Sequence, residues 1–130
     1  MPQKKPVSLW KEYLQDEVDA AYLYHCLAPL QTQDKRRELF EKLENVEKKH
    51  MQAWIELFEK EGVPHDKTDP SVKAKLMGWI AQRFGTGLIE RMVLREEANE
   101  VKAYLRLHRR TQDQSTQDLS KRLASDSAEH

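Results

Sequence analysis

The sequence predicts an all-α protein, a four-helix bundle in which a long crossover with a short helix joins the second and third long helices. Apolar residues recur at alternating spacings of three and four, the period of an amphipathic helix. With 34% charged residues, four glycines and five prolines in 130 residues, the composition suits helices better than strands. We expect residues 1–130 to form a single domain.

Two long helices are expected first. Ser8 is the expected N-cap of a helix that runs to about Gln31. The second helix is expected to start after a cap at Thr32 or Asp34 and to end at Gly62, because glycine is the usual residue just beyond a helix.

The crossover, residues 63–85, is expected to carry a short helix from about Ser71 to Phe84. Asp69 followed by Pro70 predicts its start, since a capping residue and then proline is a common beginning of a helix.

Two further helices are expected after the crossover. One runs from Thr86 to about Arg110, and the other starts near Ser115 after the polar residues 111–114. Long helices before and after one crossover predict a four-helix bundle with one long connection.

The apolar face of each long helix contains residues that commonly bind metals. The faces are Trp10, Leu14, Glu17, Ala21, Tyr24 and Ala28; Phe40, Leu43, Glu47, His50, Trp54 and Leu57; Ile89, Val93, Glu97, Glu100, Tyr104 and Leu107; and Leu119, Leu123, Asp126 or Ser127, and His130. Charged groups are too costly to bury without compensation, so their convergence predicts bound cations. The candidate ligands are Glu17, Glu47, His50, Glu97, Glu100 and His130.

The chemistry of these ligands favours iron. Glu47 and His50 are three residues apart, so their side chains lie on the same helical face and can bind one ion or two adjacent ions. Four glutamates balance two divalent ions when the histidines are neutral. Carboxylate oxygen with some imidazole suits iron(II) or manganese(II), whereas the single Cys26 argues against a thiolate zinc site. Two iron ions are therefore expected, with manganese or zinc as alternatives.

Other interpretations of the same residues stay open. Taken alone, the Glu47/His50 pair is more often a solvated pair, and Glu97 and Glu100 lie in a dense charged run that is more often a solvent-exposed face. Tyr24 and Tyr104 are expected to pack beside the site with their hydroxyls near it, rather than to be redox-active.

Four stretches carry a resemblance to a known family. The chain resembles the ferritin-like di-iron proteins, rubrerythrin in particular, and is most similar to the N-terminal rubrerythrin-like domain that some bacteria fuse to a vacuolar-iron-transporter-type membrane domain. The resemblance spans roughly residues 8–130. It is carried by residues 16–24, 47–54, 79–85 and 97–104.

The resemblance implies a role for each candidate ligand. These roles are terminal carboxylates at Glu17 and Glu97, a bridging carboxylate at Glu47, a terminal imidazole at His50, an additional carboxylate at Glu100, and the histidine of a second Glu-x-x-His pair at His130. The chain departs from the family at Ser127, where the second bridging glutamate is expected, and Asp126 is the nearest substitute.

The resemblance implies a non-haem di-iron domain that binds iron(II), oxidises it with oxygen or hydrogen peroxide, and serves iron homeostasis, with a membrane transporter domain outside this chain as partner. Whether it turns over is left open; if it does, it is a ferroxidase or a peroxide-reactive di-iron oxidoreductase. A full rubrerythrin-type peroxidase is disfavoured, because a single cysteine cannot form the electron-delivering cysteine cluster.

Two alternative functions come from other classes. One is a metal-sensing or interaction module without turnover, which agrees with an incomplete site at Ser127. The other is a structural bundle that forms a homodimer through the crossover helix, which is apolar on more than one face. The apolar residues of that helix are Val72, Leu76, Trp79, Ile80 and Phe84.

The sequence also gives expectations about location and partners. A formal net charge of 0 provides no global field to attract nucleic acid or an anionic membrane. No stretch has the apolar length of a signal peptide core or of a membrane span. We therefore expect a cytoplasmic protein without a nucleic acid partner, or the cytosolic domain of a membrane protein.

Overall fold

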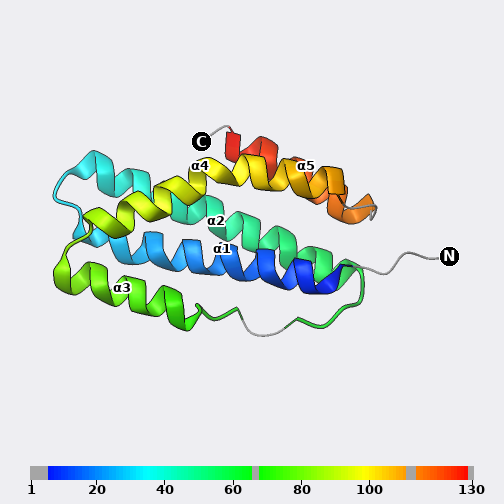
Figure 1. Cartoon of the computed structure of the whole chain (residues 1–130), viewed down its shortest axis with the longest axis horizontal. Helices are drawn as coiled ribbons and strands as arrows, with labels where there is room; N and C mark the ends of the chain where they lie inside the picture. Colours follow the sequence, from blue (N-terminus) through cyan, green and yellow to red (C-terminus); the bar gives the residue numbers. More distant parts are fainter. Residues whose placement is uncertain (1–5, 66–67, 111–113, 129–130) are drawn as a thin grey trace.

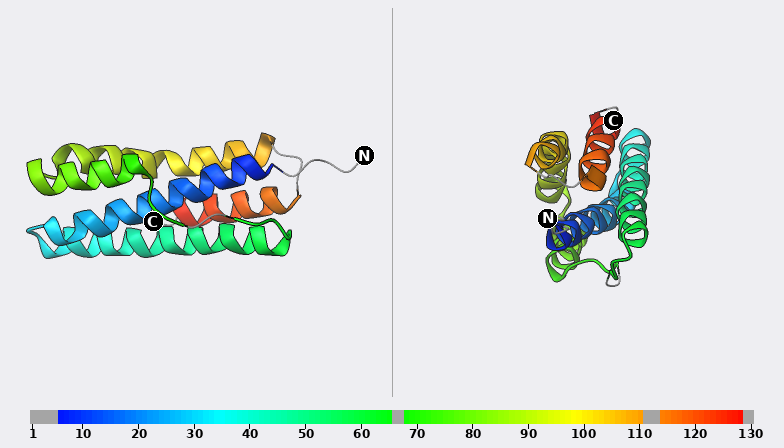
Figure 2. Two further views of the ribbon diagram at one scale, coloured as in Figure 1. Left: turned by 90° about the horizontal axis from the view of Figure 1, so that it is seen from below. Right: turned by 90° about the vertical axis from the view of Figure 1, so that its right-hand side faces the viewer.

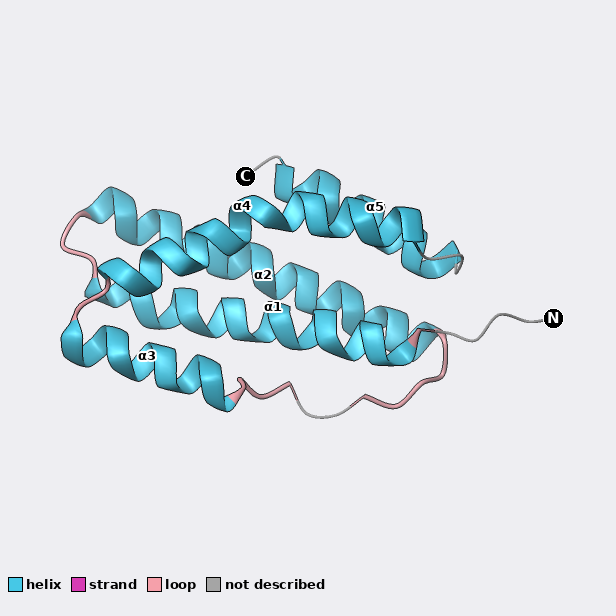
Figure 3. Cartoon of the chain, viewed as in Figure 1, coloured by secondary structure: helices cyan, strands magenta, loops and turns pink. Residues whose placement is uncertain are grey.

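The computed structural model describes residues 6–65, 68–110 and 114–128, except for the side chains of 100–101, 107–110, 114–115 and 126–128. Within these ranges the chain is all-helical and has no strand, which confirms the predicted all-α class (Figure 3). The elements are α1 (Val7–Leu27), the short 3-10 turn η1 (Ala28–Leu30), α2 (Asp34–Lys60), α3 (Val72–Phe84), α4 (Gly87–Arg110) and α5 (Gln114–Ala128).

The helix boundaries differ from the expected ones at both ends of the first helix and at the cap of the crossover helix. The first helix begins at Val7 after Pro6, so Ser8 is not its cap, and it gives way to η1 at Ala28. Pro29 within η1 has no N–H to donate to the preceding turn, which explains the early end of the regular helix. The cap of α3 is Ser71, whose hydroxyl accepts a hydrogen bond from the Ala74 N–H at 3.1 Å.

The long helices run in two antiparallel pairs. Figures 1 and 2 show α2 turning back along α1 and α5 turning back along α4, while α3 lies along α1 on the side away from α5. The two pairs meet where α5 contacts α2 and α4 contacts α1, and α3 also contacts α4. The predicted crossover therefore places its short helix beside α1.

Two features fix α3 on α1. Asp19 accepts hydrogen bonds from the backbone N–H of Ser71 at 2.8 Å and from its hydroxyl at 2.6 Å. Farther along α3, a Cβ atom at Gly78 would lie only 3.2 Å from both Cys26 Sγ and Tyr22 Cε1. Because only a residue without a side chain fits this contact comfortably, Gly78 allows the backbone of α3 to lie directly against α1.

The predicted apolar faces of the first two helices are buried along their whole length, including their polar members. The buried apolar residues form two clusters. The first is Trp10, Leu14, Val18, Ala53, Trp54, Leu57, Phe58, Tyr104, Leu119, Leu123 and Ala124. The second is Leu23, Tyr24, Leu27, Ala28, Phe40, Leu43, Ala81, Ile89 and Val93. Along α2, Glu47 and His50 lie between Leu43 of the second cluster and Trp54 of the first.

The surface of α3 keeps part of its apolar character. Val72, Leu76, Trp79 and Phe84 are exposed, whereas Ile80 packs partly against the second cluster. None of the helices, as far as the chain is described, has the length and apolar character required to cross a lipid bilayer.

A buried hydrogen bond joins the first and last helices. The indole N–H of Trp10 donates to the Thr116 hydroxyl at 2.7 Å, and both side chains are completely buried. A Thr116→Val substitution keeps the shape but removes the acceptor. We expect the free energy of unfolding to fall by about 1–3 kcal/mol, the cost of a buried unsatisfied donor, in urea denaturation followed by circular dichroism.

The exposed Ser125 on α5 provides the control for this substitution. Ser125→Ala is expected to change the free energy of unfolding by less than about 0.5 kcal/mol. Equal stabilities of the Thr116→Val and Ser125→Ala variants would contradict a structural role for the Trp10 hydrogen bond.

Candidate metal centre

Three predicted ligands form a compact buried cluster. Glu17 on α1 and Glu47 and His50 on α2 each offer one ligand atom, and these atoms all lie within 4.8 Å of one another. His50 Nδ1 is 3.3 Å from Glu17 Oε2 and 3.6 Å from Glu47 Oε2. The exposed fractions of the three side chains are 3%, 1% and 1% in that order.

Glu47 is the residue that its protein surroundings satisfy least. Both of its carboxylate oxygens are buried, and neither has a hydrogen-bond partner among the described residues. A buried carboxylate without donors is strongly destabilising, so native structures supply a donor or a cation. Even with His50 protonated, two carboxylates leave this cluster with a net charge of −1, because a single imidazolium balances only one of them. A proton on one carboxylate or a bound cation would compensate this charge, and the three residues could hold a metal ion.

The spacing of the cluster fits a small cation. Two atoms about 2.1 Å from one ion, at angles between square and tetrahedral, lie about 3.0–3.4 Å apart. The separation of 3.3 Å between His50 and Glu17 is within this range, and that of 3.6 Å between His50 and Glu47 slightly exceeds it. Because the three ligand atoms lie within 4.8 Å of one another and not closer throughout, the side chains would have to close further around a single ion.

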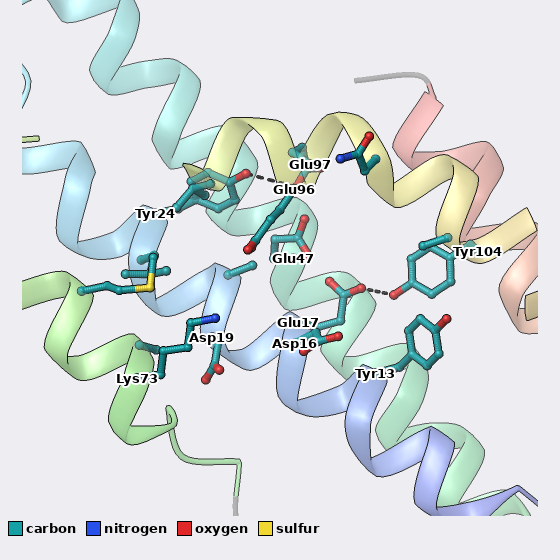
Figure 4. A pocket seen from close by; sticks show the side chains of 17 residues that line it. Tyr13, Asp16, Glu17, Asp19, Tyr24, Glu47, Lys73, Glu96, Glu97 and Tyr104 are labelled. Carbon is teal, nitrogen blue, oxygen red and sulfur yellow. Dashed lines mark hydrogen bonds between the residues drawn. The ribbon is translucent and has the colours of Figure 1, made fainter. Parts of the chain in front are cut away.

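Two tyrosines hold the carboxylates in place. The Tyr104 hydroxyl donates to Glu17 Oε1 and accepts from the indole N–H of Trp54 at 3.3 Å (Figure 4). On the other side, the Tyr24 hydroxyl donates to Glu97 Oε2 at 3.1 Å. The expectation that Tyr24 and Tyr104 pack with their hydroxyls near the site is confirmed.

The remaining predicted ligands are placed differently. Glu97 on α4 is half-buried and lies outside the compact group of three, although it faces the same cavity (Figure 4). Glu100 lies in α4, but its side chain is outside the described part of the chain, and His130 is outside the described residues altogether. The structure thus joins Glu17, Glu47 and His50 and places Glu97 nearby.

Comparison with known protein families, curated proteins and solved structures gave no match. The family resemblance therefore rests on the residues and motifs of the sequence, and the function has to be argued from the site itself.

Sequence reasoning missed a cavity of about 320 Å³ that opens between α1, α3 and α4. Besides the predicted residues, Asp16, Asp19, Glu96 and Lys73 line it (Figure 4). Desolvation, followed by repulsion from Glu12, Asp19 and Glu96, raises the pKa of Asp16 to about 6. The sequence did carry one signal for this acidic wall of the cavity: Asp16 and Asp19 are three residues apart, so they share one face of the helix.

Removal of the Glu47 carboxylate, which has no hydrogen-bond donor among the described residues, tests the electrostatic account. In excess chelator, Glu47→Leu is expected to raise the free energy of unfolding at neutral pH by about 1–4 kcal/mol, since an apolar side chain of similar size replaces a buried charge. Urea unfolding followed by tryptophan fluorescence measures this change.

Glu44→Leu, one turn earlier on α2, is the matched control. Glu44 is also buried, but it accepts from Lys48 Nζ at 2.8 Å and lies 3.1 Å from His25 Nδ1. Its removal is expected to leave stability unchanged or to lower it. A loss of stability in Glu47→Leu would show that Glu47 is satisfied in the metal-free protein.

Proposed function

We propose that this chain is an iron-binding di-iron carboxylate domain that takes up iron(II) and oxidises it. In this proposal, α1, α2, α4 and α5 form a ferritin-like four-helix bundle, and α3 is the crossover helix. The observation that carries the proposal is the buried Glu47 carboxylate, which has no hydrogen-bond donor among the described residues and lies beside Glu17 and His50.

The donor set supports iron over softer metals. Glu17 and Glu47 offer oxygen, and His50 offers one imidazole nitrogen. Such mixed oxygen and nitrogen donors suit iron(II) and manganese(II). Cys26 packs against Gly78 and Tyr22 on the α3 side of α1, and burial raises the pKa of its thiol, which disfavours a thiolate.

The described residues divide into two groups of ligands. Glu17, Glu47 and His50 would hold one iron ion. The second oxygen of Glu47 and the carboxylate of Glu97 would hold another, together with Glu100 and His130, the ligands proposed from the sequence. A carboxylate that serves both ions would account for the position of Glu47, which at 1% exposed is the most buried of the described acids of the set.

Iron is the substrate of the proposed reaction. Each of two iron(II) ions loses one electron and becomes iron(III). One hydrogen peroxide molecule takes up these two electrons and two protons and is reduced to two water molecules. If oxygen is the oxidant instead, one oxygen molecule takes up two electrons and two protons and is reduced to hydrogen peroxide. The anionic cluster favours the more highly charged product ion, and Tyr104 and Tyr24 keep Glu17 and Glu97 oriented during the change.

The resemblance extends the proposal to partners. The oxidised or bound iron would pass to a membrane transporter domain, attached to the chain or separate from it. A second copy of the chain would dock through the exposed apolar residues of α3, among them Leu76 and Trp79.

One observation favours a second candidate function. Ser127 lies in α5 at the position where the resemblance requires a bridging glutamate. A chain that lacks this ligand would bind one ion and respond to it without turnover, as a metal-sensing or interaction module.

Iron titration separates the two candidates. Anaerobic addition of iron(II) followed by air or hydrogen peroxide is expected to produce a ferric absorption band that saturates at about two irons per chain. Saturation at one ion without oxidation would favour the sensing module instead.

A cobalt(II) melting experiment tests metal binding without redox chemistry. A ligand that binds only the folded form adds about 2.7 kcal/mol when its free concentration is about 100 times Kd, so Tm should rise with added cobalt. Glu47→Ala is expected to abolish this rise while the helices stay folded, and Glu41→Ala, exposed on the same helix, is expected to retain it. An unchanged Tm in the wild-type chain would overturn the proposed function.

A further inference from the structure

The cavity beside the cluster is lined both by residues at the protein surface and by the buried carboxylates. Its walls include exposed residues of three helices, Asp16 on α1, Lys73 on α3 and Glu96 on α4. The same walls include Glu17 and Glu47, which are almost completely buried. The cavity is therefore lined by exposed charged residues and also by acids that have almost no contact with solvent (Figure 4).

The charges at the outer end of this cavity are mostly negative. Asp16, Asp19 and Glu96 are close enough to one another for Asp19 and Glu96 to act electrostatically on Asp16. Asp19 is already engaged, because it accepts hydrogen bonds from Ser71 and Gln15. Asp16 and Glu96 remain to meet an approaching ion, and Lys73 opposes them with a single positive charge.

An acidic group on a surface is common and by itself indicates nothing about a ligand. Here the inner end of the same cavity holds Glu47, 1% exposed and without a hydrogen-bond donor for either oxygen among the described residues. The outer charges and the buried acceptor are independent features, and both favour a cation.

We infer that this cavity is the access route for iron(II) and that Asp16 and Glu96 form a first, transient cation site at its mouth. The inference rests on the proposed function, because it supplies the path to the site proposed there. Carboxylates at a narrow opening raise the local concentration of cations and accelerate their association. Lys73 moderates this attraction from the α3 wall.

The rate of cobalt(II) association tests the inference. Cobalt(II) is the probe because it accepts the same oxygen and nitrogen ligands and is stable in air. Stopped-flow mixing at low ionic strength, followed by tryptophan fluorescence, gives the association rate constant. Asp16→Asn combined with Glu96→Gln is expected to lower this constant about three- to tenfold, with the number of ions bound at saturation unchanged.

Two further variants make the test specific. Lys73→Gln is expected to raise the association rate constant, because it removes the opposing charge. Glu38→Gln combined with Glu41→Gln removes the same charge as the mouth variant from exposed positions of α2 outside the cavity, and is expected to leave the constant unchanged. Added salt should reduce the differences between the variants, since it screens exposed charges.

The outcomes separate the access route from the site itself. If the wild-type chain binds cobalt and the mouth variant associates as fast as the Glu38/Glu41 control, the access route is wrong and the proposed function stands. If the mouth variant binds fewer ions at saturation, Asp16 or Glu96 is a ligand and the transient site is wrong. If the wild-type chain binds no cobalt, both proposals fail.

Discussion

The main physical constraint on this structure is the burial of two carboxylates and one imidazole within a few ångströms of one another. With both carboxylates ionised, Glu17, Glu47 and His50 carry a net negative charge even when the imidazole is protonated, because one imidazolium balances only one carboxylate. Apolar clusters lie along the helices on both sides of them. This arrangement gives up favourable apolar contacts at the centre of the molecule, in exchange for a group of side chains that could hold a metal ion.

Glu17, Glu47 and His50 form a polar layer between the two apolar clusters, and the surrounding parts of the fold support this layer. Tyr104 and Tyr24 donate hydrogen bonds to Glu17 and Glu97 from opposite ends of the layer. Glu47 alone among these carboxylates has no donor within the described residues. Because α3 is fixed on α1 by Asp19 and by the close contact at Gly78, it forms a stable wall of the cavity that leads to the layer.

The sequence was sufficient to predict the helices and the three residues of the central cluster, although within a larger set of six expected ligands. The three-four periodicity identified the buried faces of α1 and α2, and Glu17, Glu47 and His50 stood out because each interrupts an apolar face. The periodicity within one helix gives no information about the distance between that helix and its neighbour. It therefore did not show that Glu97 lies apart from the cluster, held by Tyr24 at the cavity wall.

Contacts between segments that are distant in the chain could not be predicted from the sequence either. The cap of α3 moved from Asp69 to Ser71 because Asp19, 52 residues earlier, accepts hydrogen bonds from Ser71. The cavity exists only where α3 and α4 meet α1, so the spacing of Asp16 and Asp19 on one helical face could indicate an acidic surface but not the cavity itself. Proposals about iron, oxidation and transport rest on the resemblance together with this site.

The division of the apolar core has a consequence for how the molecule opens. One cluster includes Trp10 and Phe58 near one end of the α1–α2 pair, and the other includes Leu27 and Phe40 near its opposite end. Stability in such a protein is distributed over separate cooperative units. A cation that bridges α1 and α2 at Glu17 and Glu47 would couple the two ends, so that amide hydrogen exchange at both ends would slow together on metal binding.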